Sequence, residues 1–253
     1  MIVTTNEELQ SLRKSGKLLA DTLRALKKEV KPGVTSAHLD LLAEKMIREG
    51  GGVPAFLNYK QEGSAYPFPA ALCVSINDEV VHGIPTEQKI IKEGDVVMLD
   101  LGVSYNGYFT DAAVTVIAGE GDEKGKTLVA ATEEAFKAAL KVIKPGSRMG
   151  DIGAAIEAVA RKYYFSVAED LGGHSLGLVP HEAPYVANTG KPGTGEVLVE
   201  GLVLAVEPIF TEGRGAIELD VDQWTYRTRD GSRSAETEHT ILVTKDGAEI
   251  LTA

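Results

Sequence analysis

Four acidic residues of this chain end or open apolar, strand-like runs where a core side chain would be expected. Asp100 follows Val-Val-Met-Leu, Glu207 follows Val-Leu-Ala-Val, and Asp111 and Glu238 each follow a threonine. Strands that are apolar throughout are usually covered on both faces, so a carboxylate at such a place is at least partly buried. A buried carboxylate without a partner is costly, and no lysine or arginine lies within two residues of any of the four. Taken singly, each could still be an ordinary acid at a strand end.

The four acids occupy matching positions in two similar halves of the chain, which favours a shared site. Asp100 and Glu207 each stand six residues after a glycine, Gly94 or Gly201. A pseudo-symmetric fold would bring all four together, and like charges at short range repel strongly. Divalent ions resolve this conflict, because four carboxylates carry −4 and two ions carry +4. His174, flanked by glycines, adds an imidazole, and such a donor set suits Mn²⁺, Fe²⁺, Co²⁺ or Zn²⁺.

A paired-metal site of this kind predicts amide hydrolysis, because it activates a water to hydroxide and polarises a carbonyl oxygen. Hydrolysis also needs proton transfer and stabilisation of the tetrahedral intermediate. His82 and His181 lie in two matching His-x-x-Pro segments and are the predicted catalytic groups outside the ligand set. Glu207 is predicted to bind metal with one oxygen and to accept the proton of the water with the other.

The elements that must position these residues also repeat along the chain. Thr5 and Glu8 form a capping-box pattern that predicts a helix over residues 5–28. A second helix is expected over 36–49, followed by strands at 72–76, 80–81, 96–101 and 112–117. The second half predicts helices at 132–143 and 150–164 and strands at 197–199, 202–206 and 240–243. The charged run 120–126 between the halves is interpreted as a solvated turn.

A Lys-Pro-Gly break follows the first predicted helix of each half, at Lys31 and again 113 residues later at Lys144. Together with the matched acids and histidines, it indicates an α+β fold of two related halves. No segment is linker-like enough to separate them. We expect one catalytic domain, residues 1–253, with halves of about 1–120 and 121–253.

Composition excludes several classes of protein. The 253 residues contain 37 acidic and 26 basic side chains, a net charge of −11, which argues against a nucleic-acid partner. Cys73 is the only cysteine, so no internal disulfide or cysteine-only metal site is possible. No signal-peptide pattern and no apolar run of about 20 residues is present, so we expect a cytoplasmic protein without a membrane partner.

The motif set resembles the methionine aminopeptidases over nearly the whole chain, from the first helix to Leu251. The residues that carry this resemblance are Asn77-Asp78-Glu79-Val80-Val81-His82-Gly83-Ile84-Pro85, Asp100, Thr110-Asp111, Gly173-His174, Val206-Glu207-Pro208 and Glu238-His239-Thr240. Glu207 and Glu238 are only 31 positions apart, which leaves no room for the large insertion of the type II enzymes, so the chain looks like type I. The resemblance implies the pita-bread fold, with a central antiparallel sheet, pseudo-two-fold symmetry and outer helices.

The resemblance also implies the roles of individual residues. Two divalent ions, with Co, Mn, Fe and Zn all left open, would be held by Asp100, Asp111, His174, Glu207 and Glu238. His82 and His181 would contact the scissile peptide. Tyr59, Phe68, Cys73 and Trp224 would line the pocket for the methionine side chain. Differences from the family pattern gather at this pocket: Phe56, Phe68, Pro180, Ser175 and a lengthened loop, 60–67.

The implied reaction is removal of the initiator methionine from nascent polypeptides whose second residue is small. The expected partners are nascent N-termini, at the ribosome, and the family resemblance implies a monomer. Two alternatives remain open from the sequence. One is an aminopeptidase of the same fold with broader or X-Pro preference, and the other is a metal-free binding protein on this fold.

Overall fold

The first two helices form where the sequence places its start and stop signals. The computed structural model describes residues 1–60 and 64–253. Helix α1 (Asn6–Glu29) begins with the predicted capping box, in which the Thr5 side chain accepts from the Glu8 amide and the Glu8 carboxylate accepts from the Thr5 amide. Helix α2 (Ser36–Glu49) is capped by Thr35 and ends at Gly50. Both predicted helices are therefore confirmed.

The rest of the first half consists of antiparallel strands. Their bounds are β1 (Val53–Pro54), β2 (Leu72–Ile76), β3 (Glu79–Val81), β4 (Val96–Tyr105) and β5 (Tyr108–Ile117). The long strands β4 and β5 pair over their whole length, from Val96 opposite Ile117 to Tyr105 opposite Tyr108. Strand β2 pairs with the other edge of β4, which places Cys73 directly opposite Asp100.

The second half again places two helices before its main strands. Its elements are α3 (Glu123–Val142), α4 (Met149–Tyr163), β6 (Ser166–Val167), β7 (Gly172–Ser175), β8 (Glu182–Ala187), β9 (Val203–Val206), β10 (Ile209–Thr211), β11 (Ile217–Leu219), β12 (Tyr226–Thr228), β13 (Ser234–Glu236), β14 (His239–Thr244) and β15 (Gly247–Ile250). Five of these strands form a sheet in the order β15-β14-β9-β7-β8.

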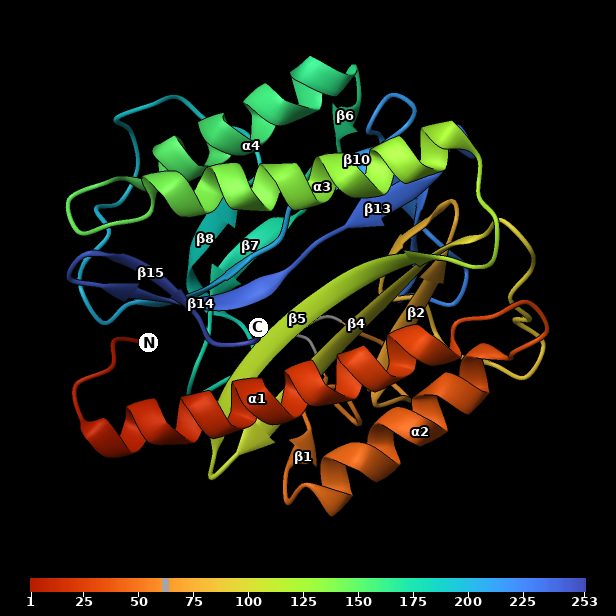
Figure 1. Cartoon of the computed structure of the whole chain (residues 1–253), viewed down its shortest axis with the longest axis horizontal. Helices are drawn as coiled ribbons and strands as arrows, with labels where there is room; N and C mark the ends of the chain where they lie inside the picture. Colours follow the sequence, from red (N-terminus) through yellow and green to blue (C-terminus); the bar gives the residue numbers. More distant parts are fainter. Residues whose placement is uncertain (61–63) are drawn as a thin grey trace.

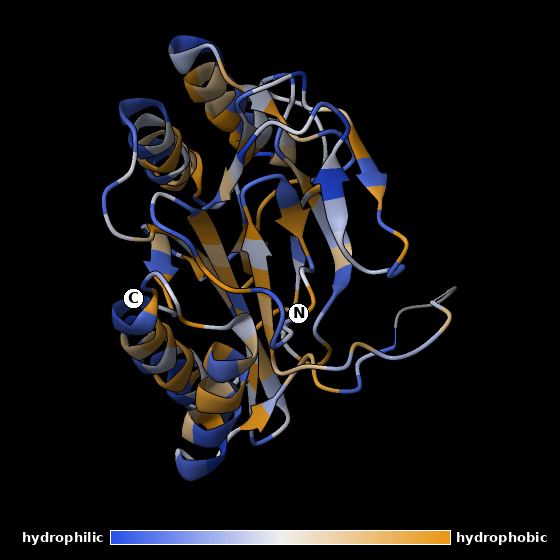
Figure 2. Ribbon diagram, turned by 90° about the vertical axis from the view of Figure 1, so that its right-hand side faces the viewer, coloured by the Kyte–Doolittle hydropathy of each residue, from blue (hydrophilic) through white to orange (hydrophobic). Residues whose placement is uncertain are grey.

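The helices lie in two pairs on one side of the strands. Figure 1 shows α1 with α2 and α3 with α4 as the two pairs, with the strands between them. In Figure 2 the helices lie on one side of the strands, and loops and short strands lie on the other. One apolar core packs α1 and α2 against β2, β4 and β5, and a second packs α3 and α4 against β9 and β14. The other face of the strands, away from the helices, carries no helix in the described part of the chain, and the candidate site lies on that face.

Three predictions about the elements need correction. Asp100 lies within β4 rather than at its end, because β4 continues to Tyr105 through its pairing with β5. The run 120–126 is not wholly a turn: Asp122 caps α3, which begins at Glu123, nine residues before the predicted start. Residues 197–199 form no strand, and only Val197 makes an isolated bridge, to Arg148. The strand predicted at 72–76 is confirmed with its bounds, and the other predicted strands are present with one or both ends shifted.

No helix among the described residues combines the length and the apolar character required to cross a membrane.

Candidate metal centre

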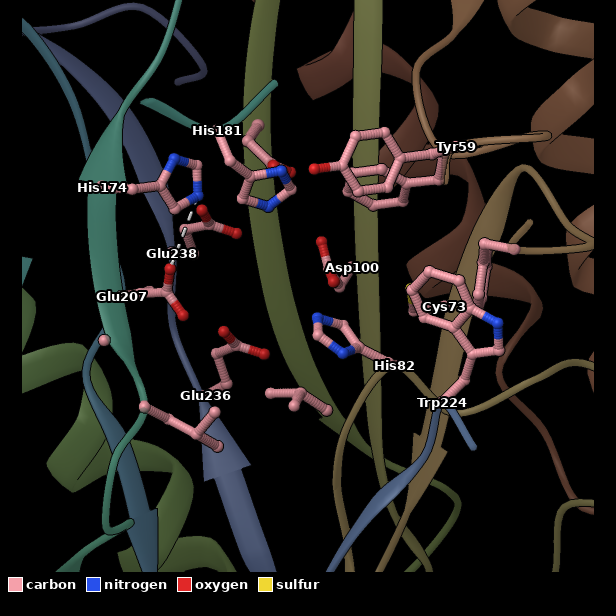
Figure 3. A pocket seen from close by; sticks show the side chains of 16 residues that line it. Tyr59, Cys73, His82, Asp100, His174, His181, Glu207, Trp224, Glu236 and Glu238 are labelled. Carbon is pink, nitrogen blue, oxygen red and sulfur yellow. Dashed lines mark ion pairs between the residues drawn. The ribbon is translucent and has the colours of Figure 1, made fainter. Parts of the chain in front are cut away.

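A cavity of ≈ 200 Å³ opens on the side of the strands away from the helices and contains every residue that the sequence singled out for chemistry. Its walls are carboxylates and imidazoles at one end and aromatic side chains at the other (Figure 3). The lining residues are Phe56, Tyr59, Phe68, Cys73, Val81, His82, Asp100, Asp111, Leu171, Gly172, His174, His181, Glu207, Trp224, Glu236 and Glu238.

Strand register brings the acids of the two halves together. Asp100 lies opposite Ala113, two residues from Asp111 on β5, so the two side chains share one face as diagonal neighbours. Glu238 exchanges both backbone hydrogen bonds with Ala113, at 3.0 and 3.2 Å, and so joins them from the second half. Thr240 fixes this contact, because its hydroxyl accepts from the Asp111 amide at 2.8 Å and donates to the Asp111 carbonyl oxygen at 2.7 Å.

The second half positions its donor side chains in the same way, because residues two apart in a strand point to the same face. Ala205 on β9 lies opposite both His174 and Thr240, so Glu207, two residues after Ala205, and Glu238, two residues before Thr240, lie on that same face. Gly173 allows β7 to approach closely, because a Cβ there would lie 2.2 Å from the Ala205 carbonyl oxygen. The glycine before His174 is therefore a packing requirement of the strand pair that carries the ligand.

The donor atoms lie close enough together to hold ions. Donor atoms of Asp100, Asp111 and Glu238 all lie within 4.8 Å of one another, and so do those of His174, Glu207 and Glu238. A third such group is Asp111, His174 and His181. His174 Nε2 stands 3.7 Å from a Glu207 oxygen. Glu238 belongs to both of the first two groups, and Asp111 belongs to the first and the third.

The charge state of these groups fits a cation. Asp111 and Glu238 are 4% and 3% exposed, and burial raises their pKa well above the usual carboxyl value. Burial likewise raises the pKa of Asp100 to about 7 and that of Glu207 to about 8. The buried oxygens Asp100 Oδ1 and Asp111 Oδ1 have no hydrogen-bond partner. Clustered carboxylates with unpaired buried oxygens are what a divalent ion requires, because it offsets their charge and coordinates the oxygens.

His174 is present in the form that binds metal. Burial, with a smaller contribution from His181, lowers its pKa to about 3, so its imidazole is neutral at pH 7. A neutral ring keeps a nitrogen lone pair free for coordination. The Nδ1 atom lies 3.0 Å from the Ser175 carbonyl oxygen, which leaves Nε2 facing Glu207.

The two remaining histidines face the carboxylates from opposite walls. His82 follows β3 with a φ of 57°, a left-handed conformation that a non-glycine residue adopts only where the surroundings hold it. Burial, with His181 as the next cause, lowers the pKa of His82 to about 4. His181 lies next to His174, with ring centroids 4.3 Å apart, and next to Tyr59, at 5.3 Å.

Arg227 joins the strand before His82 to the hairpin that carries Trp224. Its guanidinium donates to Asp78 and Glu79 at 2.9 Å and also pairs with Asp220. Because Asp78 and Glu79 precede His82 and Asp220 precedes Trp224, these ion pairs fix two walls of the cavity relative to each other. The Thr225 hydroxyl adds a long hydrogen bond to the His82 carbonyl oxygen at 3.4 Å.

The apolar end of the cavity contains the four residues predicted for the side-chain pocket. Phe68, Cys73 and Trp224 are at most 5% exposed, and Phe56 and Tyr59 pack with them. Phe68 meets Trp224 edge to face at 5.3 Å. Of the differences from the family pattern, Phe56 and Phe68 line the cavity, whereas Pro180 and Ser175 do not. The lengthened loop 60–67 includes residues 61–63, which lie outside the described residues.

Sequence reasoning missed one group of the cavity. Glu236, the last residue of β13, is 3% exposed and lines the same cavity as a fifth carboxylate. The count of four charges made from the sequence was therefore incomplete. The signal was available, since Glu236 precedes Glu238 by two residues and so shares its face in an extended segment.

A profile of metallopeptidase family M24 matches residues 10–245 of the chain. Fold and donor set thus agree with a metal-dependent peptidase.

Among curated proteins, the methionine aminopeptidase of Aquifex aeolicus is 43% identical over 250 residues, which cover 98% of this chain and 97% of the relative. Methionine aminopeptidase 1 of Bacillus subtilis is 38% identical over 252 residues, which cover 100% of this chain and 99% of the relative. Among solved structures, the methionine aminopeptidase of Thermotoga maritima superposes with a TM-score of 0.94 at 44% identity, covering 100% of this chain and 99% of that one. The chain belongs to metallopeptidase family M24 and, within it, to the methionine aminopeptidases.

More distant structures share only the fold. A prolidase from Pyrococcus furiosus superposes with a TM-score of 0.76 at 24% identity, and this chain covers 65% of it. The pita-bread fold expected from the sequence is thereby confirmed. The alternative of a prolidase-like enzyme is not favoured, because the relatives similar over their full length are methionine aminopeptidases.

Proposed function

We propose that this protein removes the N-terminal methionine from polypeptides by metal-dependent amide hydrolysis. One observation carries the proposal: the carboxylate and imidazole donors converge at one end of a cavity whose other end is an apolar, aromatic pocket. An apolar pocket with a few fixed polar groups is what recognition of a small ligand requires. The arrangement fits a substrate with an apolar first side chain and a peptide bond beside the metal ligands.

We propose that the site holds two divalent ions, Co, Mn, Fe or Zn. Asp100 would hold one ion, His174 and Glu207 the other, and Asp111 and Glu238 would be shared between the two. The sharing of Glu238 between two donor groups supports this division. Such ions supply a Lewis acid for the substrate carbonyl and a water of lowered pKa. Titration of the metal-free protein with Mn²⁺ by calorimetry tests the number, and a stoichiometry of one would refute the pair.

The side chains of this protein perform the proton transfers. Glu207 would accept the proton of the attacking water with the carboxylate oxygen that a bound ion leaves free. His82 is neutral because its pKa is lowered to about 4, so its ring N–H can donate a hydrogen bond to oxygen without adding charge to the site. His181, on the opposite wall, is proposed to contact the scissile peptide.

The pocket for the methionine side chain is proposed to be lined by Tyr59, Phe68, Cys73 and Trp224. Cys73 has a small side chain, and burial raises the pKa of its thiol well above the usual value, so it is a neutral wall and not a nucleophile. The edge-to-face pair of Phe68 and Trp224 gives the pocket a fixed width. A flexible, unbranched thioether fits such a slot better than a β-branched side chain does.

Peptide hydrolysis with Mn²⁺ or Co²⁺ added tests the activity. We expect Met-Ala-Ser to lose its methionine, while Leu-Ala-Ser and Ala-Pro-Ser release their first residue at least about tenfold more slowly, on the order of 1.4 kcal/mol of discrimination. Faster release from Leu or X-Pro peptides would favour the broader enzyme. Purified protein without stoichiometric metal and without release of any residue would favour a binding protein.

The substrates and location proposed here follow from this activity. Nascent polypeptide N-termini at the ribosome are the proposed partners, and the cytoplasm is the proposed location; an acidic chain with one buried, unpaired cysteine is compatible with both. We propose a monomer without direct nucleic-acid or membrane binding. Light scattering tests the monomer, and cosedimentation with ribosomes tests the association.

A further inference from the structure

The hairpin of β11 and β12 forms one wall of the cavity and packs against His82. Trp224, which is 5% exposed, lies in the turn of this hairpin and meets the His82 ring edge to face, with ring centroids 6.3 Å apart (Figure 3). Tyr226, on β12, meets the same ring at 6.2 Å. A shift of the hairpin against β3 would therefore change the distance between the proposed pocket wall and a proposed catalytic group.

The backbone pairing between this hairpin and the strand before His82 is irregular. Strand β12 pairs with β3, but the register shifts between Tyr226, opposite Val81, and Arg227, opposite Glu79. Such a shift disrupts the ladder of hydrogen bonds and bends the strand locally. Side-chain contacts at this point therefore contribute to the position of the hairpin.

The Arg227 guanidinium bridges the two strands at this irregular point. It donates to Asp78 and Glu79 at 2.9 Å each, and its Nε pairs with Asp220. The Glu79 side chain is 6% exposed. A single exposed ion pair contributes little, but a planar guanidinium that donates to three carboxylates is held in one orientation. Asp220 belongs to the hairpin and Asp78 and Glu79 to the β3 side, so the guanidinium connects two walls of the cavity.

We propose that Arg227 is a positioning residue that determines selectivity for the first side chain of the substrate, because it holds Trp224 at a fixed distance from His82. This inference rests on the proposed function. A pocket with a fixed wall rejects a side chain of the wrong shape, whereas a pocket whose wall shifts accepts it. Arg227 is not among the described residues that line the cavity, so it acts through Trp224 and not by touching the substrate.

The selectivity of Arg227→Met tests this role. The variant keeps an unbranched side chain but loses the three contacts with carboxylates. The ratio of its kcat/KM values for Met-Ala-Ser and Leu-Ala-Ser is therefore expected to fall at least about threefold. Arg229→Met is the matched control, because it removes a guanidinium that is 64% exposed and donates within the hairpin, to the Ile217 carbonyl oxygen at 2.9 Å. It should keep the preference of the wild type.

The fluorescence of Trp224 gives a second readout that needs no activity. Trp224 is the only tryptophan of the chain, so the emission of the protein reports on this wall. We expect metal-free Arg227→Met to emit at longer wavelength and to be quenched more strongly by acrylamide than the wild type. Arg229→Met should show neither change.

A second variant tests the same bridge from the β3 side. Asp78→Asn removes one contact and leaves Arg227 paired with Glu79 and Asp220, so it disturbs the fold less. It should change the preference and the emission in the same direction as Arg227→Met. If Arg227→Met does not fold, Asp78→Asn decides the question, and wild-type behaviour of that variant overturns the proposal.

The outcomes are distinct. An unchanged preference in folded Arg227→Met, or an equal loss in Arg229→Met, overturns the proposal. A lost preference with unchanged emission overturns Trp224 as the wall through which Arg227 acts. Failure of the proposed function is a different result, in which wild-type protein releases no methionine, while the emission still shows whether Arg227 holds Trp224 in place.

Discussion

Two carboxylates illustrate how residue chemistry depends on surroundings in this protein. Glu79 and Glu207 are both deeply set, but Glu79 has two cations and Glu207 has acids and His174 around it. Burial raises the pKa of Glu207 to about 8 in the metal-free cluster, so a bound cation is what would keep this carboxylate ionised at neutral pH. The same amino acid is therefore structural at one position and reactive at the other.

Glu207→Ala is expected to lower kcat by a factor of about 10²–10⁴, because both a metal ligand and the proton acceptor are lost. The fold should persist, since no ion pair with lysine or arginine depends on Glu207 in the described chain. Hydrolysis of Met-Ala-Ser measures the loss, and circular dichroism checks the fold. Full activity of the variant would remove Glu207 from the mechanism.

Metal-free protein is expected to lose stability as the pH rises from about 4, the unfolded carboxyl value, to about 8, and most clearly above about 6.5, where unfolded histidine no longer titrates. The raised pKa values of Asp100, about 7, and Glu207, about 8, mean that the native state retains protons that the unfolded chain, with carboxyl pKa values near 4, has lost. Stability falls with pH wherever the native state binds more protons, by about 1.4 kcal/mol per pH unit for each retained proton. His82 and His174 have lowered pKa values, so their titration changes the free energy of unfolding only at more acidic pH.

Urea unfolding at several pH values measures this slope. Glu207→Gln should make the fall of the unfolding free energy with pH less steep. Saturating Mn²⁺ should reverse the sign of this slope, because the metal replaces the retained protons. A metal-free stability that rises with pH above about 6.5 would contradict the expectation.

At the scale of elements, the site depends on how closely strands approach. His174 reaches the carboxylates because β7 lies tightly against β9, and Gly173 permits this contact. Gly173 therefore contributes to the metal centre by allowing the close contact of β7 and β9, although it has no side chain.

Gly173→Ala is expected to destabilise the protein by about 1–3 kcal/mol, because the new methyl group would overlap the Ala205 carbonyl oxygen and force the strands apart. Mn²⁺ affinity should fall with it, as His174 moves away from Glu207. Gly193→Ala, at an open position in an exposed turn, is a control for substituting glycine, although its φ of 75° adds some strain of its own. Equal effects of the two variants on Mn²⁺ affinity would refute the role of the strand contact.

The elements were predictable where local chemistry decides them. The capping box at Thr5 and the glycine stops define α1 and α2, and the matched acids of the two halves predicted four carboxylates that line one cavity. Strands β10 to β13 were missed because they have three residues each and owe their register to partners distant in the sequence. Glu236 was missed for the same reason, since its short polar strand has no counterpart in the repeat. The start of α3 was missed because a charged run resembles a solvated turn, although Asp122 in it is a helix cap.

At the scale of the whole molecule, five clustered carboxylates are a stability cost that cations should remove. Metal binding to the native state stabilises it by mass action, by about 2.7 kcal/mol at a concentration 100 times Kd.

Added Mn²⁺ is therefore expected to raise the melting temperature by several degrees, and EDTA should reverse the shift. Asp111→Asn should abolish most of the shift, because it removes a ligand at a 4% exposed position. Scanning calorimetry with and without Mn²⁺ measures both. A melting temperature that does not respond to Mn²⁺ in the wild type would exclude a metal centre in the native protein.

The ligands span residues 100 to 238, and Glu238 lies directly before β14, the last strand but one. A ribosome synthesises Asp100, Asp111 and His174 long before it reaches Glu238, and N-terminal parts of a chain emerge first. Glu238 is therefore the last proposed ligand to arrive, so a partly made chain displays isolated acids and no complete ion site. Under the proposed function, the complete ion site therefore forms only near the end of synthesis, and the protein acquires its activity once it has been almost completely made.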